Sequence, residues 1–384
     1  MKEVYKYDWL IVGAGLFGAT FANLLKKDGK KVLVIDKRSH IGGNCYIQNR
    51  DNIPVHVYGP HIFHTNDNSI WEYVNQFVDF NRFTNCPKAR YIDKKNNIDE
   101  MFSLPFNMNT FYELFKTSTP EKAKHIINKE IEEARNKIGH EPTNLEEQAL
   151  LLVGKTIYKY LIKNYTERQW GRKCTELDPN IIKRLPLRYS YNNNYFNDKY
   201  QGVADYTLMI QKMLDGCEVA LNSNYFCYKE QYDNLAEHVL YTGPIDAYFN
   251  YHFQPLEWRS VYWKTYSTDP DISQGNAVIN NVGPDNDYTR TIEHKYFNMM
   301  DENYLIKKNW FSEEYSIEWK PNCGFDPCYP IYNESTKFQL IQYKTLADAE
   351  KKTIFGGRLA DFKYMDMDDT IKAAMELYYT ITNK

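Results

Sequence analysis

Three glycines near the start of the chain have the spacing of a dinucleotide-binding turn. Gly13, Gly15 and Gly18 form a GxGxxG motif between an apolar run at residues 9–12 and a stretch of helical periodicity at residues 17–25. A strand in this position delivers the chain into a tight turn that glycines accommodate, and the following helix points its first amides at a pyrophosphate. The motif in this context predicts a dinucleotide site, whereas the same glycines without it would indicate only a turn.

An acidic residue closes the next apolar run. Asp36 follows residues 31–35, where a carboxylate can accept a hydrogen bond from a ribose hydroxyl. Lys37 and Arg38 come directly after it, and a glycine pair at residues 42–43 lets the backbone approach a bulky planar ligand. This order is typical of flavin proteins of the glutathione-reductase type, so the expected cofactor is FAD.

The other end of the chain offers a second element for this site. Residues 353–358 predict a strand that runs into a Gly-Gly turn and ends at Arg358, with a helix expected over about residues 368–379. In flavoproteins of this type the last strand and helix return to the flavin. Arg358 is therefore a candidate partner of the pyrophosphate or the isoalloxazine, and an exposed arginine after a turn is the alternative.

Composition limits the classes of function. The chain has 384 residues, enough for about two or three domains, and its net charge of -3 offers no polybasic surface for nucleic acid. Seven cysteines without CxxC or zinc spacing fit a reducing compartment. The first residues run straight into a strand, which leaves no room for a signal peptide, and no apolar run approaches the roughly 20 residues that span a bilayer. We expect a cytoplasmic protein without a membrane span or a nucleic-acid partner.

Periodicity along the chain predicts an α/β fold with three regions. A Rossmann-like FAD-binding domain is interrupted by a helical subdomain and by an antiparallel β-sheet domain. Such interruptions usually place a substrate pocket over the cofactor. The expected bounds are residues 1–84, 203–247 and 340–384 for the FAD-binding domain, 107–180 for the helical subdomain, and 85–106, 187–202 and 248–339 for the sheet domain.

Short motifs without an obvious packing role occur along the chain, at residues 58–65, 165–171, 182–186, 288–290, 328–330 and 363–366. In this order and spacing they resemble the bacterial UDP-galactopyranose mutases, flavoenzymes that interconvert the pyranose and furanose forms of UDP-galactose. The resemblance covers essentially the whole chain. It implies reduced FAD as cofactor, a UDP-galactose-like substrate, an external reductant such as NAD(P)H, a homodimer, and a role in cell-surface polysaccharide biosynthesis.

The resemblance assigns the pyrophosphate of the substrate to Arg184 and Arg290, the two catalytic candidates, with hydroxyl groups from Tyr195, Tyr329 and Tyr364. Each guanidinium offers a bidentate fork, and a charge-assisted hydrogen bond contributes roughly 1.5–3 kcal/mol. Two such groups could hold the leaving group near the sugar throughout the reaction. Without the resemblance, either residue would be read as an ordinary surface arginine.

Tyr165 and Trp170 match the residues that cradle the nucleotide and sugar, and Trp170 resembles an indole on a mobile lid around residues 170–186. Closure of a lid would exclude water from a glycosyl intermediate. Core packing of the indole is the alternative. The other matched substrate positions are Asn85, Leu161, Ile162, Thr166, Asn280 and Asp366.

The resemblance also places His61, Ile62 and His64 along the isoalloxazine. Two histidines three residues apart lack the further ligands that zinc takes, so no metal site is expected. Either histidine could instead be structural. The complete set of expected cofactor residues is Gly13, Gly15, Phe17, Gly18, Asp36, Lys37, Arg38, Gly43, Asn44, His61, Ile62, His64, Gly357, Arg358, Met365 and Asp366.

In enzymes of this family, N5 of the reduced flavin attacks the anomeric carbon and expels UDP, after which the sugar ring opens and recloses through another hydroxyl. No Ser-His-Asp or Cys-His arrangement is evident in the sequence, which agrees with a cofactor nucleophile. The expected function is therefore the interconversion of UDP-galactopyranose and UDP-galactofuranose. A flavin oxidoreductase of the amine-oxidase type and a non-catalytic nucleotide-sugar sensor are the alternatives.

Three departures from the family pattern leave the sugar open. Only residues 203–205 stand where the family has a longer, glycine-containing stretch, Cys328 replaces the first tyrosine of Tyr-Tyr-Pro, and Ser316 replaces a proline. These changes spare the flavin and phosphate positions. UDP-N-acetylgalactosamine and a deoxysugar carried by dTDP are therefore alternative substrates for the same chemistry.

Overall fold

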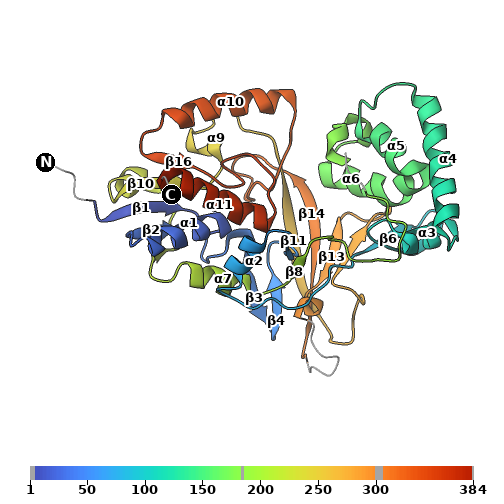
Figure 1. The fold of residues 1–384 in the computed structure, drawn as a ribbon, viewed down its shortest axis with the longest axis horizontal. Helices are drawn as coiled ribbons and strands as arrows, with labels where there is room; N and C mark the ends of the chain where they lie inside the picture. The colour runs from blue at the N-terminus through green and yellow to red at the C-terminus, as the bar shows by residue number, and fades with distance from the viewer. Residues whose placement is uncertain (1–4, 183–185, 299–305, 383–384) are drawn as a thin grey trace.

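Two β-sheets of different kinds organise the chain, which the computed structural model describes over residues 5–182, 186–298 and 306–382. A five-stranded sheet lies at one end of the molecule, a lobe of helices lies at the other, and a seven-stranded sheet stands between them (Figure 1).

The five-stranded sheet is parallel throughout and has the strand order β16-β10-β1-β2-β9. Its central strands are apolar and buried on both faces, as expected for a parallel sheet covered on both sides. One face packs against helices α1 (Leu16–Lys27), α7 (Tyr206–Met213) and α11 (Met367–Thr382). The strands are β1 (Tyr7–Val12), β2 (Val32–Ile35), β9 (Glu218–Ala220), β10 (Ala236–Tyr241) and β16 (Thr353–Phe355).

The seven-stranded sheet has the order β15-β11-β14-β13-β12-β6-β7 and is antiparallel except where β12 pairs with β6. Its longest pair is formed by β11 (Trp258–Thr268) and β14 (Asn309–Glu318). β6 and β7 form an antiparallel hairpin at one edge of this sheet. The remaining strands are β6 (Lys88–Asp93), β7 (Ile98–Ser103), β12 (Val278–Asn281), β13 (Arg290–Glu293) and β15 (Tyr329–Pro330).

The helical lobe has an apolar core of its own, to which α3, α4 and α5 each contribute buried side chains. In the sequence, helical periodicity runs over residues 145–152 and resumes over 156–162. Between them lies Gly154, whose φ of +80° interrupts the helical backbone within α5. One π-helical turn follows, and α6 completes the lobe. The elements are α3 (Met108–Phe115), α4 (Pro120–Ile138), α5 (Leu145–Ile157), the π turn (Tyr158–Ile162) and α6 (Lys163–Trp170).

Shorter elements join the regions. The hairpin of β3 and β4 and the pair of β5 and β8 form two small antiparallel sheets. The remaining elements are β3 (Ile47–Arg50), β4 (Ile53–His56), β5 (Phe63–Thr65), β8 (Tyr200–Gly202), α2 (Asn68–Val74), α8 (Lys229–Asp233), α9 (Ile245–Tyr248) and α10 (Glu334–Ala349). Among the helices of the described residues, none has the length and hydropathy needed to cross a bilayer.

The predicted fold class is confirmed, because the structure combines a Rossmann-like parallel sheet with an antiparallel sheet and a set of helices. The parallel sheet collects strands from three separate stretches of the chain, so its residues are contiguous in space and not in sequence. The exact bounds given for the three domains stay a prediction.

Candidate functional site

A cavity of about 2610 Å³ is lined by residues from both sheets and from the helical lobe. Val12, Ile35 and Tyr241, at the carboxyl ends of three parallel strands, lie at one end of it. Drug-sized ligands occupy pockets of about 300–1,000 Å³. The cavity therefore has room for two ligands of that size.

Backbone atoms form the wall next to the parallel sheet. β1 leads into Gly13, whose φ is +117°, and a Cβ there would lie 2.1 Å from Oγ1 of Thr242. A Cβ on Gly43 would lie 2.9 Å from Cα of Gly15. α1 begins directly after Gly15, and no side chain caps its first amides. This bare cradle at a helix N-terminus fits the pyrophosphate of a dinucleotide.

The Asp36 carboxylate is held beside this cradle. Its Oδ2 accepts the N–H of Ala14 at 2.8 Å and its Oδ1 accepts the N–H of Arg38 at 2.8 Å. An ionised carboxylate has about four acceptor positions, so two are left for a ligand hydroxyl. Asp36 is therefore oriented as a ribose acceptor requires.

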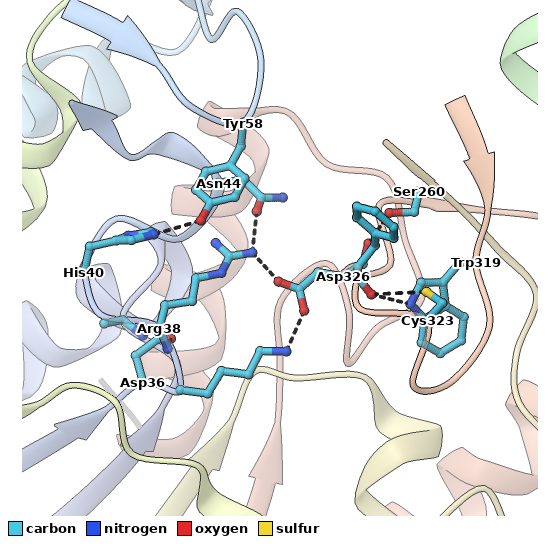
Figure 2. Close-up of polar contacts among 12 residues, drawn as sticks. Asp36, Arg38, His40, Asn44, Tyr58, Ser260, Trp319, Cys323 and Asp326 are labelled. Carbon is cyan, nitrogen blue, oxygen red and sulfur yellow. Dashed lines mark hydrogen bonds and ion pairs between the residues drawn. The ribbon is translucent and has the colours of Figure 1, made fainter. Parts of the chain in front are cut away.

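Two cations follow Asp36, and both bind the same acid from a distant part of the chain. Arg38 donates to Asp326 at 2.5 Å and to Oδ1 of Asn44 at 3.1 Å, and Lys37 lies 2.5 Å from Asp326. The guanidinium of Arg38 also lies over the ring of Tyr58, 4.4 Å from its centre. Figure 2 shows the Asp326 carboxylate directed at the guanidinium of Arg38.

His61 lines the cavity, within electrostatic reach of Arg358 as well as Arg290. Its Nδ1 is 2.8 Å from the carbonyl oxygen of Gly59, which can only accept, so Nδ1 carries the proton and Nε2 is left as an acceptor. Burial, with a smaller contribution from Arg358 and Arg290, lowers the pKa of His61 to about 4. The ring is therefore neutral at neutral pH.

His64 is engaged by the protein itself. Its Nδ1 lies 2.7 Å from Asp198, and its ring stacks on Phe196 with the ring centres 3.8 Å apart. Within the ranges that the structure describes, no group of three or more histidine, cysteine or acidic side chains could hold a metal ion.

Arg290, whose side chain is 23% exposed, provides a partly buried positive charge in the cavity wall. It donates to Oε2 of Glu314 at 2.6 Å, and Oε1 of the same carboxylate accepts from Thr289 at 2.6 Å. Burial, the largest single influence, lowers the pKa of Arg290, but Glu314 together with Tyr165 and Tyr329 outweighs it, so the pKa of the guanidinium is raised. The Nε of Arg290 is buried and has no partner among the described residues.

Two tyrosines lie near this charge. The rings of Tyr329 and Tyr364 are 6.0 Å apart at 21°, and the hydroxyl of Tyr364 donates to Asp366 at 3.1 Å. Arg358 lies 4.9 Å from the centre of the Tyr364 ring and donates to the carbonyl of Cys328 at 2.7 Å. Burial, the largest cause, raises the pKa of Tyr364 and of Tyr329, so both phenols keep their protons at neutral pH.

The end of α6 carries Trp170 into the cavity and is fastened to the seven-stranded sheet. The carbonyl of Gln169 accepts from Nε of the buried Arg259 at 3.0 Å and from the hydroxyl of Ser316. Arg168 donates at 2.7 Å each to the carbonyls of Asn281, the last residue of β12, and Gly283. Ser316, one of the departures from the family pattern, thus contributes a hydroxyl to the anchor of this helix.

The structure brings nearly all of the predicted site residues that it describes to this one cavity. Two do not line it: Gly15, and Gly18, where a Cβ would meet the carbonyl of Gly13 at 2.1 Å, so Gly18 serves the close packing of α1 on β1. Arg184 lies outside the described residues. The cavity-lining predictions are Gly13, Phe17, Asp36, Lys37, Arg38, Gly43, Asn44, His61, Ile62, His64, Asn85, Leu161, Ile162, Tyr165, Thr166, Trp170, Tyr195, Asn280, Arg290, Tyr329, Gly357, Arg358, Tyr364, Met365 and Asp366.

Sequence reasoning missed several lining residues. Residues 223–226 line the cavity just past β9, a strand of three residues that gives too short a pattern to recognise. Tyr58, Thr242 and Asp326 also line it. The one available signal was position, because Asp326 stands two residues before the motif at 328–330.

Comparisons with known proteins bear on this site. A family model described as UDP-galactopyranose mutase matches residues 160–364, and one described as NAD(P)-binding Rossmann-like domain matches residues 11–77. The chain is 39% identical over 378 residues to the probable UDP-galactopyranose mutase of Klebsiella pneumoniae, covering 96% of this chain and 92% of that protein. The chain belongs to the UDP-galactopyranose mutase family. This member is therefore an enzyme of the mutase class, which confirms the resemblance seen in its sequence.

Other relatives act on a different nucleotide sugar or share only the fold. This family member is also 35% identical to the dTDP-fucopyranose mutase of Escherichia coli, with 96% of each chain covered. A crystal structure of reduced UDP-galactopyranose mutase aligns with a TM-score of 0.67 at 12% identity, covering 99% of this chain and 94% of that one. A putrescine oxidase variant aligns with a TM-score of 0.54 at 12% identity, covering 98% and 99%. At such identity these two likenesses show the fold alone.

Proposed function

We propose that this protein interconverts UDP-galactopyranose and UDP-galactofuranose with reduced FAD as its cofactor. The observation that carries the proposal is that one cavity joins a bare backbone cradle to a partly buried guanidinium surrounded by tyrosines. The cradle suits the pyrophosphate of FAD, and the guanidinium suits the pyrophosphate of a nucleotide sugar. The two ligands would then meet near His61.

At the cofactor end, the residues of this chain bind and orient. The first amides of α1 would hold the FAD pyrophosphate, Asp36 would accept from its ribose, and Arg358 would lie beside the isoalloxazine. The neutral His61 offers Nε2 as an acceptor at the same place. When bound, reduced FAD supplies the nucleophile N5, which would take the anomeric carbon in a covalent adduct as UDP departs.

The protein's own nucleophiles are poorly suited to that step. Cys45 and Cys328 line the cavity, but burial raises the pKa of Cys45 to about 12 and also raises the pKa of Cys328. A thiol that keeps its proton is a weak nucleophile. This supports chemistry carried by the cofactor, with positioning and electrostatics supplied by the protein.

At the substrate end, Arg290 and Arg184 would hold the pyrophosphate, and the hydroxyls of Tyr195, Tyr329 and Tyr364 would donate to it. Because Arg290 is already neutralised in part by Glu314, its position is fixed before the substrate arrives. Retention of the UDP group beside the sugar would favour its return after ring opening. The positions proposed for the base and sugar are Asn85, Leu161, Ile162, Tyr165, Thr166, Trp170, Asn280 and Asp366.

Several further assignments belong to the same proposal. Trp170 would cover the substrate as part of a lid around residues 170–186 and exclude water during the reaction. Activity would need an external reductant such as NAD(P)H, and the enzyme would work as a cytoplasmic homodimer in the biosynthesis of cell-surface polysaccharide.

A second substrate class is favoured by one observation. A relative with 35% identity is named a dTDP-fucopyranose mutase, so this sequence family accepts more than one base and sugar. A dTDP-deoxysugar, or UDP-N-acetylgalactosamine, would use the same phosphate and flavin positions. These substrates are alternatives to UDP-galactose within one mechanism.

The deciding experiment incubates the purified protein with UDP-galactofuranose, UDP-N-acetylgalactopyranose or a dTDP-deoxysugar, each with and without dithionite. Anion-exchange chromatography then separates the pyranose and furanose forms. We expect reductant-dependent interconversion without net oxidation, fastest with UDP-galactofuranose. Faster conversion of another sugar would move the assignment to that substrate.

A third outcome would reject the mutase chemistry. If the bound flavin is reduced and no sugar isomerises, the proposal fails. Oxygen consumption with an amine substrate would then identify an oxidoreductase of the type that shares this fold. Binding of UDP without any turnover would indicate a sensor.

A further inference from the structure

The segment between β14 and β15, residues 319–328, crosses from the seven-stranded sheet to the cofactor end of the cavity. We call it the strap. Its backbone is fixed to the sheet, because the hydroxyl of Ser260 on β11 donates to the carbonyl of Asp326 at 2.5 Å. Within the strap, the indole N–H of Trp319 donates to the carbonyl of Phe325 at 2.9 Å and so anchors the turn. Figure 2 shows Ser260 and Trp319 on the side of Asp326 that is away from Arg38.

The carboxylate of Asp326 points away from these anchors to the cations that follow the ribose acid. One oxygen lies 2.5 Å from Lys37 and the other 2.5 Å from Arg38. The Arg38 side chain is 17% exposed and that of Asp326 33%, so this contact is partly shielded from water and salt. Burial raises the pKa of Asp326, but Arg38 and then Lys37 outweigh it and lower that pKa. The carboxylate is therefore ionised at neutral pH.

The strap meets the other end of the cofactor site two residues later. The carbonyl of Cys328 accepts from Arg358 at 2.7 Å, and the next residue is Tyr329 of β15. Arg38 follows β2 and Arg358 follows β16, so they come from different parts of the parallel sheet. One short segment therefore binds an arginine at each end of the proposed FAD site and continues into a proposed substrate residue.

We propose that Asp326 is a positioning residue of the cofactor site, which acts through Arg38 and Lys37 and holds the strap closed over the dinucleotide. The inference rests on the proposed function only in placing FAD in the cradle. Release of FAD then requires the Asp326 contacts to open. The rate of release is accordingly set in part by an ion pair between the two sheets, independently of which sugar is turned over.

The test measures FAD release from the purified flavoprotein, as the rise in flavin fluorescence after dilution. With Asp326→Asn, which removes the negative charge, we expect release about 10-fold to 100-fold faster at 0.05 M NaCl, as for the loss of a partly buried charge pair. For the unmodified protein, release should accelerate between 0.05 and 0.5 M NaCl because salt screens the contact. Asp326→Asn should lose most of this acceleration, and Asp326→Glu should return the rate to within about 3-fold of the original.

The matched control is Asp99→Asn. Like Asp326→Asn, this substitution breaks an aspartate–arginine pair. The pair in question, Asp99 with Arg90 in the seven-stranded sheet, is exposed and does not line the cavity. We expect no change in FAD release from Asp99→Asn. Release from Asp326→Asn at the original rate, or an equal acceleration in both variants, would overturn the proposal while leaving the mutase activity to its own test.

A second variant covers the case in which Asp326→Asn loses its flavin during purification. Lys37→Gln removes the more exposed of the two cations, whose side chain is 60% exposed. We expect release about 2-fold to 3-fold faster, with a weaker dependence on salt. An unchanged rate together with an unchanged salt dependence would overturn the proposal.

Discussion

The two ends of the cavity are built by different means. At the cofactor end the wall is backbone, formed by the turn after β1, the first turn of α1 and residues 42–43. At the substrate end it is made of side chains, such as Arg290 on β13, Tyr329 on β15 and Trp170 at the end of α6. A phosphate that binds to amides needs a particular chain path, whereas one that binds to guanidinium and hydroxyl groups needs separate elements to be brought together.

This difference determines what each end tolerates. A substitution at the cofactor end matters where it blocks the backbone, as at Gly13, or where it removes one of the few side chains that act on the dinucleotide, as at Asp36. A change at the substrate end removes a binding group directly, as at Arg290, or shifts the helix that carries it, as at Ser316. Substitutions at the two ends should therefore affect FAD and the nucleotide sugar separately.

The largest expected effect is on the substrate side. Arg290→Leu removes a partly buried charge and leaves the Glu314 carboxylate, 2% exposed, without its cationic partner. We expect kcat/KM for isomerisation to fall about 10³-fold, because truncation of a buried charge pair costs about 2–5 kcal/mol. The affinity of the apoprotein for FAD should stay the same. Steady-state kinetics and flavin titration measure the two quantities.

Two variants control this prediction. Arg290→Lys keeps the charge and should recover part of the activity. Arg90→Leu removes an exposed arginine on β6 of the same sheet, paired with Asp99, and should leave kcat/KM unchanged. If FAD affinity fell as much as activity in Arg290→Leu, the two ends would not be separately built.

The reverse experiment acts on the cofactor side. Gly13→Ala puts a Cβ 2.1 Å from Oγ1 of Thr242 at a φ of +117°, which strains the turn by about 1–3 kcal/mol. We expect FAD to bind about 100-fold more weakly, since about 2.7 kcal/mol corresponds to that factor. Binding of UDP to the apoprotein, followed by calorimetry, should be unchanged.

Gly29→Ala is the matched control for Gly13→Ala. Gly29 also has a positive φ, +75°, but a Cβ there would meet no atom within 4 Å. It should cost some stability and leave FAD affinity as it was. Equal weakening of FAD binding by both variants would show that strain alone, and not the cradle, is responsible.

His61, within electrostatic reach of Arg358 as well as Arg290, should make the protein sensitive to acid. Its pKa, about 4, lies below the unfolded value of about 6.5, so its stabilising contribution is present above pH 6.5 and is lost as pH falls toward 4. We expect His61→Asn to remove up to about 2 kcal/mol of the fall in unfolding free energy between pH 6.5 and 5. Urea denaturation at each pH measures this.

In His61→Asn the unfolding free energy should still fall with decreasing pH, but less steeply, because burial also lowers the pKa of His56 and of His294. His125→Asn, at an exposed position of α4, is the control and should leave the slope unchanged. A slope identical to that of the unmodified protein in His61→Asn would contradict the neutral, buried state of His61.

The smallest effect is expected at Trp170. Trp170→Ala should raise KM for the nucleotide sugar about 10-fold, because stacking of a base on an aromatic ring contributes about 1–3 kcal/mol. FAD release should not change. Trp310→Ala is the control, since Trp310, on β14, donates to Asp51 and does not line the cavity. An unchanged KM would remove Trp170 from the substrate site.

The same contrast explains what the sequence could and could not predict. The turn at Gly13 and the acid at Asp36 are local patterns, and their chemistry follows from a strand, a turn and a helix in succession. The convergence of Arg290, Tyr329 and Trp170 is a product of tertiary structure, and only resemblance to a family brought these residues together. No local pattern singles out one arginine in a β-strand.

Asp326 shows most clearly the limit of prediction from the sequence. Its partners Lys37 and Arg38 lie far away in the sequence, and no periodicity or spacing links the two segments. Gly154 is an intermediate case, because the pattern showed a break in the helix but not the positive φ that causes it. Ser316 counted only as a departure from the family until its hydroxyl was seen at the end of α6.

The place of β16 in the parallel sheet has a consequence for the order of synthesis. The first glycine turn leaves the ribosome long before the edge strand Thr353–Phe355 and the helix that packs on α1. At about 5–20 residues per second, some tens of seconds separate these two events. During that interval α1 has an uncovered face, and β10 has an open edge from the time of its own synthesis; both favour misassociation. The nascent chain is therefore most in need of chaperones before β16 and α11 have been made.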